Sequence, residues 1–182
     1  ISYAGGSLKF DEDAKKAGWT RDIEVGDPVG YKKLCMLNAF NMTIPGIPTI
    51  YYGDEFGSPG GNDPDNRRMM RFSGLNDNEN KTREISRKLV NIRRNNLALI
   101  YGDFTTLLVE QDVYAYARCY LNYKVVVVFN KSYLTKDIKI TLPDAYQGKE
   151  FITSFGSIFS GKGDKLMLTL ADNSFEILVV KD

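Results

Sequence analysis

The sequence changes its hydrophobic pattern near residue 100, and this change restricts the chain to a fold with two unlike parts. Beyond Tyr101, short segments rich in β-branched and aromatic residues alternate with turn signals such as Gly-Lys and Asp-Asn. Seven segments have this composition: 103–111, 113–121, 123–131, 136–143, 149–155, 164–170 and 174–182. Because they recur at a regular spacing with no helical pattern between them, they predict an antiparallel β-sandwich or a Greek-key barrel.

The first hundred residues have a helical pattern instead. Residues 28–43 and residues 79–96 each place apolar side chains along one stripe of a helix. Between them, residues 47–52 ("IPTIYY") form an apolar run without alternation, which predicts a short strand buried on both faces, as in a parallel sheet covered by helices. The order helix, strand, loop, helix is typical of a β/α unit. The predicted fold class is therefore α/β over residues 1–100 followed by all-β over residues 101–182.

Composition excludes several classes of partner. The chain has 182 residues, a net charge of +1 and no histidine, so it lacks the basic surface expected of a protein that binds nucleic acid or an anionic membrane. No apolar run approaches the length of a membrane span. The two cysteines have no metal-binding spacing, and we predict no cofactor and no metal site. Because the chain begins with Ile1, we expect it to be a processed or excerpted piece of a longer protein, and its compartment stays open.

The loop of residues 53–72 is the candidate functional segment. It directly follows the predicted strand, and in α/β barrels the loops after the strands carry the chemistry. Asp63 precedes a proline, which favours an extended backbone at that position, and Arg67 comes four residues later. A carboxylate and a guanidinium that face one cleft can together accept from and donate to the vicinal hydroxyls of a sugar. The alternative is that Asp63 and Arg67 pair with each other, or with Glu55, and only brace the loop.

The motif "GIPTIYYGDEFG", followed by "GGNDPDNRRMMRF", resembles the last β/α unit of the catalytic barrel in the α-amylase family of glycoside hydrolases. Within this family the motif is most similar to the cyclomaltodextrinase and neopullulanase-like members. The resemblance implies that residues 1–100 are the terminal unit of a TIM (β/α)8 barrel and that residues 101–182 are a Greek-key β-sandwich. It also implies that Asp63 and Arg67 contact a glucose unit of an α-glucan on the donor side of the cleft. A periplasmic or extracellular bacterial enzyme fits this family, and a cytoplasmic one is possible.

The resemblance gives this chain no catalytic residue. A retaining glycosidase needs two carboxyl groups about 5 to 5.5 Å apart. In this family these groups, a third carboxylate and two histidines lie on earlier strands of the barrel. We therefore do not assign Asp54 with Glu55, or Asp63 with Asp65, as a catalytic pair. The expected function is that of a fragment of a retaining hydrolase of starch, maltooligosaccharides or cyclodextrins, inactive alone, with transglycosylation and a calcium site in the parent left open.

Two other interpretations stay open at this point. The chain could be a non-catalytic carbohydrate-binding or domain-packing module, which would need exposed aromatic residues on one face of the sandwich. Alternation within residues 113–121 places three such aromatic candidates on one face together with Arg118, although packing against the first half is the favoured interpretation: Tyr114, Tyr116 and Tyr120. Trp19 could stack on a sugar, although a packing role is favoured for it as well. Since a single barrel strand has two unpaired edges, we also expect an unusual or swapped dimer.

Overall fold

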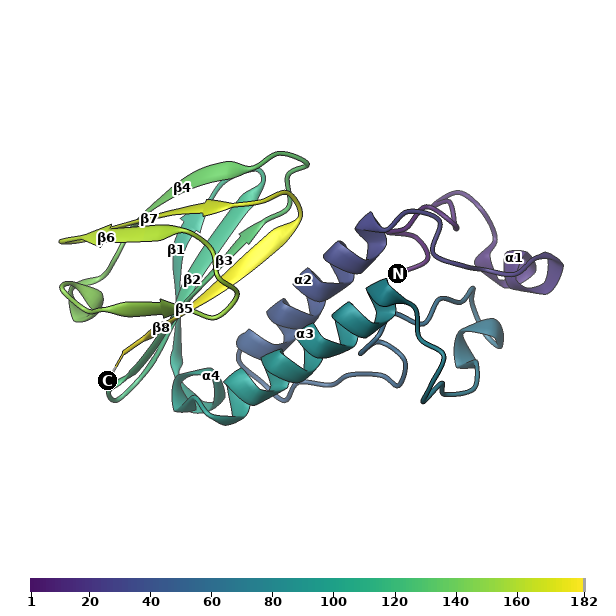
Figure 1. Cartoon of the computed structure of the whole chain (residues 1–182), viewed down its shortest axis with the longest axis horizontal. Helices are drawn as coiled ribbons and strands as arrows, with labels where there is room; N and C mark the ends of the chain where they lie inside the picture. The colour runs from purple at the N-terminus through teal and green to yellow at the C-terminus, as the bar shows by residue number, and fades with distance from the viewer. Residues whose placement is uncertain (182) are drawn as a thin grey trace. The chain divides into compact units, whose positions relative to one another are not determined.

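The structure is a computed structural model that describes residues 1–181, apart from the side chain of Lys162. Its contacts divide the chain into two compact units, of which the first contains Ile1–Asn38 and Thr49–Leu89. The second unit contains Ala39–Pro48 and the remainder of the chain from Val90. Two long helices contribute to both units (Figure 1).

The first unit is built from helices and long connecting loops. Its elements are α1 Ala14–Thr20, most of α2 Val29–Thr43, the 3₁₀ turn η1 Asp65–Arg67 and most of α3 Asp77–Arg94. Helix α3 begins with a capping box, in which the Asn76 side chain accepts from the Glu79 N–H at 3.0 Å and the Glu79 carboxylate accepts from the Asn76 N–H at 2.9 Å. Both predicted long helices, 28–43 and 79–96, are confirmed to within two residues at each end.

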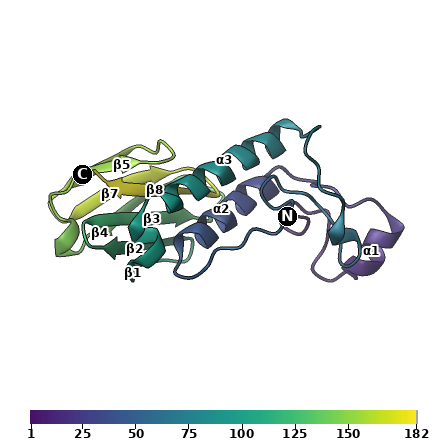
Figure 2. The same ribbon diagram turned by 90° about the horizontal axis from the view of Figure 1, so that it is seen from below.

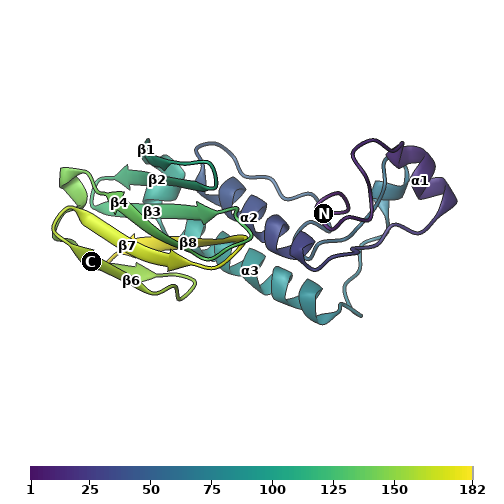
Figure 3. The ribbon, with the colours of Figure 1, turned by 90° about the horizontal axis from the view of Figure 1, so that it is seen from above.

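Helices α2 and α3 lie side by side, as Figures 1 and 3 show. Within the first unit the amide of Asn38 on α2 donates to the Ser86 hydroxyl on α3 at 3.2 Å, and both residues are buried. The same Asn38 amide donates to the Asp54 carbonyl at 3.3 Å. One buried side chain thus joins both helices to the loop that carries the candidate site.

The prediction of a strand at residues 47–52 is wrong. This segment has no regular secondary structure and forms no ladder with any other part of residues 1–181. Nor is it buried on both faces, because Ile47 is 95% exposed and Tyr51 and Tyr52 are each nearly half exposed. A strand requires a neighbouring strand to pair with its N–H and C=O groups, and the sheet strands of this structure all come from residues 103–180.

The second unit contains two antiparallel sheets. The strands within the described residues are β1 Asp103–Val109, β2 Val113–Tyr120, β3 Tyr123–Asn130, β4 Lys136–Thr141, β5 Phe151–Thr153, β6 Phe159–Lys162, β7 Lys165–Leu170 and β8 Ser174–Val180. One sheet has the order β1-β2-β3-β8-β5 and the other β4-β7-β6 (Figure 1). Each of the seven predicted segments contains one of these strands. The short β6, "FSGK", was not predicted because its glycine and serine give no strand signal. Helix α4 Leu97–Tyr101 and the 3₁₀ turn η2 Asp144–Tyr146 complete the unit.

The two sheets share one apolar core. It is built from alternate residues of both sheets, including Ala115, Val126 and Leu178 from the larger sheet and Ile140 and Leu168 from the smaller one. Alternation of buried and exposed positions along β4 and β7 matches a strand with one face on the core and one in water. This arrangement confirms the antiparallel all-β part of the predicted fold.

The C-terminal end of α2 belongs to the second unit and is covered by two buried arginines. Arg93 donates to the carbonyls of Met42 at 2.8 Å and Gly46 at 2.6 Å, and Arg118 donates to the carbonyl of Thr43 at 2.6 Å. The last carbonyls of a helix have no partner inside it, and cations are favoured at that end of the helix dipole. The arginines therefore satisfy groups that would otherwise be buried without a donor.

No helix in the described part of the chain is long and apolar enough to span a bilayer. Likewise, residues 1–181 contain no group of three or more His, Cys, Asp or Glu side chains placed to bind a metal ion. Both cysteines are free, and burial raises the pKa of the Cys35 thiol.

Candidate functional site

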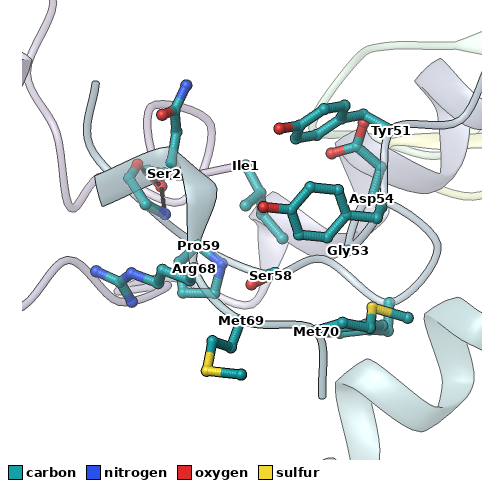
Figure 4. Close-up of a pocket in the computed structure, with 14 residues that line it drawn as sticks. Ile1, Ser2, Tyr51, Gly53, Asp54, Ser58, Pro59, Arg68, Met69 and Met70 are labelled. Carbon is teal, nitrogen blue, oxygen red and sulfur yellow. Dashed lines mark hydrogen bonds between the residues drawn. The ribbon is translucent and has the colours of Figure 1, made fainter. Parts of the chain in front are cut away.

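The segment that follows residues 47–52 makes a tight turn and borders a pocket in the first unit. The Glu55 carboxylate accepts from the Gly53 N–H at 2.7 Å, so this side chain braces its own turn. Gly53 has a φ of 94°, a conformation that favours glycine. The pocket has a volume of about 230 Å³. Its walls include Tyr51, Asp54, Ser58, Arg68, Met69 and Met70 (Figure 4).

A bidentate ion pair braces the far side of the pocket. Arg68 donates from Nε and Nη2 to the two carboxylate oxygens of Asp65, at 2.9 Å each, and from Nη1 to the Ile23 carbonyl at 2.9 Å. Asp65 also accepts from the Gly61 N–H at 2.7 Å. These hydrogen bonds, with the Arg68 interaction the strongest, lower the pKa of Asp65. The loop is thus cross-linked at both ends of η1.

The same loop packs on α1. The Asn62 N–H donates to the Ala14 carbonyl at 3.2 Å. A Cβ added at Gly61 would lie 2.6 Å from that carbonyl, and one added at Gly18 would lie 2.8 Å from the Asp65 Cβ. Only glycine fits such close approaches. In Figures 2 and 3 the loop that carries η1 lies beside α1.

The two residues predicted to contact substrate form an exposed pair on this braced loop. Arg67 Nη2 lies 2.5 Å from Asp63 Oδ1, and the side chains are 59% and 55% exposed. They are therefore brought together, as the bracing alternative expects, yet both keep open faces toward solvent. The two residues on either side of Arg67 in the sequence, Asn66 and Arg68, line the pocket. The Asp63–Arg67 pair stands next to the pocket.

Tyr51, Tyr52 and Asp54 form the opposite wall. The tyrosine rings lie with centroids 4.6 Å apart. A hydrogen bond to Tyr52 raises the pKa of Tyr51, and the positive charge of Arg67 acts against that rise. Partial loss of hydration raises the pKa of Asp54. Both tyrosines are nearly half exposed.

This arrangement has the groups needed to bind a polyhydroxylated ring. Asp63 supplies acceptors, Arg67 supplies a planar set of donors, and the tyrosines supply apolar ring faces with hydroxyl groups. Carboxylates such as those of Asp63 and Asp65 are already engaged by arginines. The site thus suits recognition of hydroxyl groups better than proton transfer.

Other residues singled out in the sequence have clear positions. Trp19 is 70% exposed, so the favoured packing role for it is wrong. In the second unit, Tyr116 and Arg118 are buried, with Tyr116 packed edge-on against Phe40 of α2. The favoured interpretation of this face as a packing surface is confirmed for both residues. The Asp65–Arg68 brace was missed, although its i, i+3 spacing is a recognisable signal for an ion pair.

Comparison with known proteins identifies the relatives of the chain. No protein-family model matches it. An amylopullulanase from Thermoanaerobacter thermohydrosulfuricus is 37% identical over 76% of this chain and 10% of the relative. A cyclomaltodextrinase from Thermoanaerobacter pseudethanolicus is 39% identical over 76% of this chain and 23% of the relative. The chain belongs to the α-amylase family. It matches a C-terminal portion of the family's enzymes.

A solved structure leads to the same family. The α-amylase from Geobacillus thermoleovorans, determined with acarbose, superposes with a TM-score of 0.74 at 26% identity, covering 93% of this chain and 36% of the amylase. The chain therefore spans only about a tenth to a third of these α-amylase-family proteins.

Proposed function

We propose that this chain supplies one wall of the substrate cleft and the C-terminal domain of a retaining α-glucan hydrolase. In this proposal residues 1–100 are the last β/α unit of a (β/α)8 barrel and residues 101–182 are its β-sandwich domain. The catalytic carboxylates come from outside the chain. The substrate is starch, a maltooligosaccharide or a cyclodextrin. This agrees with relatives named amylopullulanase and cyclomaltodextrinase and with an α-amylase whose structure was solved with acarbose.

The observation that carries the proposal is the exposed Asp63–Arg67 pair on a loop that is otherwise fixed. The loop is fixed by Asp65, Arg68 and the glycine contacts with α1, so the exposed pair is not needed to brace it. Exposed ion pairs contribute little to stability, about 0 to 1 kcal/mol. A rigid loop that presents a carboxylate and a guanidinium is pre-organised for a sugar.

The competing proposal, a sandwich that binds carbohydrate through aromatic residues of β2, has less support. Tyr116 is fully buried and Arg118 is 1% exposed, so the centre of that face has no access to a ligand. Self-association stays part of our proposal, because residues 47–52 have the composition of a strand but pair with no strand within residues 1–181.

Binding of maltotriose, measured by calorimetry, tests the role of the pair. We expect Asp63→Ala and Arg67→Ala each to weaken binding about tenfold, since one hydrogen-bonding partner of the sugar is lost. The control is Asp164→Ala, which removes another solvent-exposed ion pair, with Lys165 in the sandwich, and should leave binding unchanged. Equal affinity of the Asp63, Arg67 and wild-type proteins would contradict the proposal.

A second measurement addresses the catalytic carboxylates. Incubation of the chain with maltoheptaose should release no new reducing ends, because the chain has no carboxyl pair assigned to cleavage. Turnover that tracks the purified chain would contradict this part of the proposal.

A further inference from the structure

Trp19 is a large aromatic residue whose exposed position the packing of the first unit does not explain. It belongs to α1, whose inward face packs through Ala17 against Leu8 and Ile23. Because an α-helix turns by about 100° per residue, Trp19 lies about 200° from Ala17 and about 100° from Gly18. The indole therefore points away from the small core of the first unit, in agreement with its 70% exposure.

Gly18, which precedes Trp19 in the sequence, packs against the loop that carries Asp63 and Arg67. Gly18 is in close contact with Asp65 and Gly61, the residues at either side of the Asp63 turn. Trp19 thus stands at the border of the contact between α1 and the loop that presents Asp63 and Arg67. The Asn62–Ala14 hydrogen bond and the tight glycine contacts keep this spacing fixed.

We propose that Trp19 is an additional sugar-binding platform, which stacks on a glucose ring at least two units along the glucan from the one that Asp63 and Arg67 contact. This inference rests on the proposed function of that pair. The flat indole offers a large apolar face and loses little conformational entropy on binding. A glucan that reaches both places must be longer than a disaccharide, so Trp19 gives the site its preference for longer linear α-glucans.

The chain provides a direct reporter for this test, because Trp19 is its only tryptophan. Stacking of a sugar should shift the Trp19 emission to shorter wavelength and protect it from acrylamide quenching. We expect both effects with maltoheptaose and neither with maltose. The measurement uses the unmodified chain and does not depend on a variant.

Calorimetry with variants completes the test. Trp19→Ala should weaken maltoheptaose binding about five- to tenfold and maltose binding less than twofold. Tyr133→Ala, which removes an equally exposed aromatic side chain from the sandwich, is the control and should change neither affinity.

The possible outcomes separate this inference from the proposed function. Wild-type binding of maltoheptaose with unchanged Trp19 emission, and with equal affinity of Trp19→Ala, overturns the platform and leaves the role of Asp63 and Arg67 intact. An equal loss for maltose and maltoheptaose also overturns it, because Trp19 would then act on the same glucose as the pair. Absence of binding to either sugar overturns both proposals.

Discussion

Arg67 and Arg68 are neighbours in the chain but form ion pairs of different kinds. Arg67 pairs with Asp63 through one nitrogen, and both side chains are more than half exposed. Arg68 pairs with Asp65 through two nitrogens and adds a bond to the Ile23 carbonyl. Bidentate geometry and partial burial make the second pair the stronger one. One arginine is thus available for a ligand while the other fixes the loop.

We expect Asp65→Asn to destabilise the first unit by about 1 to 2 kcal/mol at pH 7, because Arg68 loses its charged partner and Gly61 a charged acceptor. Urea unfolding followed by far-UV circular dichroism measures this, since most of α2 and α3 lies in the first unit. Asp11→Asn, at an exposed position, is the control and should have little effect.

The cost of Asp65→Asn should also depend on pH. The pKa of Asp65 is lowered in the folded chain, so its stabilising effect is complete above the ordinary carboxyl pKa and is lost as pH falls through the folded value. The difference between the two proteins should therefore be constant near pH 7 and shrink below about pH 4. A difference that grows toward acid pH would contradict the assignment.

At the scale of elements, the end of α2 depends on side chains from distant parts of the chain. Arg93 comes from α3 and Arg118 from β2, and both donate to carbonyls at or beyond the last turn of α2. Within the described residues, the hydrogen bonds of both guanidinium groups go to backbone carbonyl oxygens. The guanidinium groups therefore stabilise the end of α2. They also fix the backbone of residues 44–46, which connects α2 to residues 47–52.

We expect Arg93→Met to lower the free energy of unfolding of the second unit by about 2 kcal/mol, because the carbonyls of Met42, Ile44 and Gly46 lose a buried donor. Arg94→Met removes an exposed arginine from the same helical turn and should cost less than about 0.5 kcal/mol. Urea unfolding followed by far-UV circular dichroism compares the two. Equal costs would show that the carbonyl contacts of Arg93 do not stabilise the unit.

The sequence predicts well those elements that are determined by residues close together in the chain. Periodicity and capping signals place α2 and α3, and alternation places the strands of the sandwich. Residues 47–52 have strand composition, but a strand also needs partners, and composition does not reveal whether they are present. The contact between Arg118 and the Thr43 carbonyl joins positions 75 residues apart, so no local pattern could indicate it. For the site, Asp63 and Arg67 could be singled out by spacing, whereas the exposure of Trp19 required the structure.

For the molecule as a whole, the second unit joins residues from both halves of the sequence. Residues Ala39–Pro48 belong to the same compact unit as the sandwich. Thr43 donates its hydroxyl proton to the Ala39 carbonyl at 2.6 Å and lies 2.5 Å from the Tyr116 hydroxyl, which is left as the donor in that second bond. The predicted domain boundary between residues 100 and 101 stays a prediction, and a cut there would separate Tyr116 from Thr43.

A double-mutant cycle in the full chain measures how strongly this link contributes. We expect Tyr116→Phe and Thr43→Val each to destabilise the second unit, because each leaves the other hydroxyl without its buried partner. The double variant should cost less than the sum of the two, with a coupling of about 1 kcal/mol, since both members of one hydrogen bond are then gone. Tyr114→Phe combined with Thr43→Val is the control pair and should be additive, because the Tyr114 hydroxyl is bonded to Thr106 instead. Additive costs for Tyr116 and Thr43 would mean that this hydrogen bond adds nothing to stability, and the end of α2 would then be held by the arginine contacts to its carbonyls.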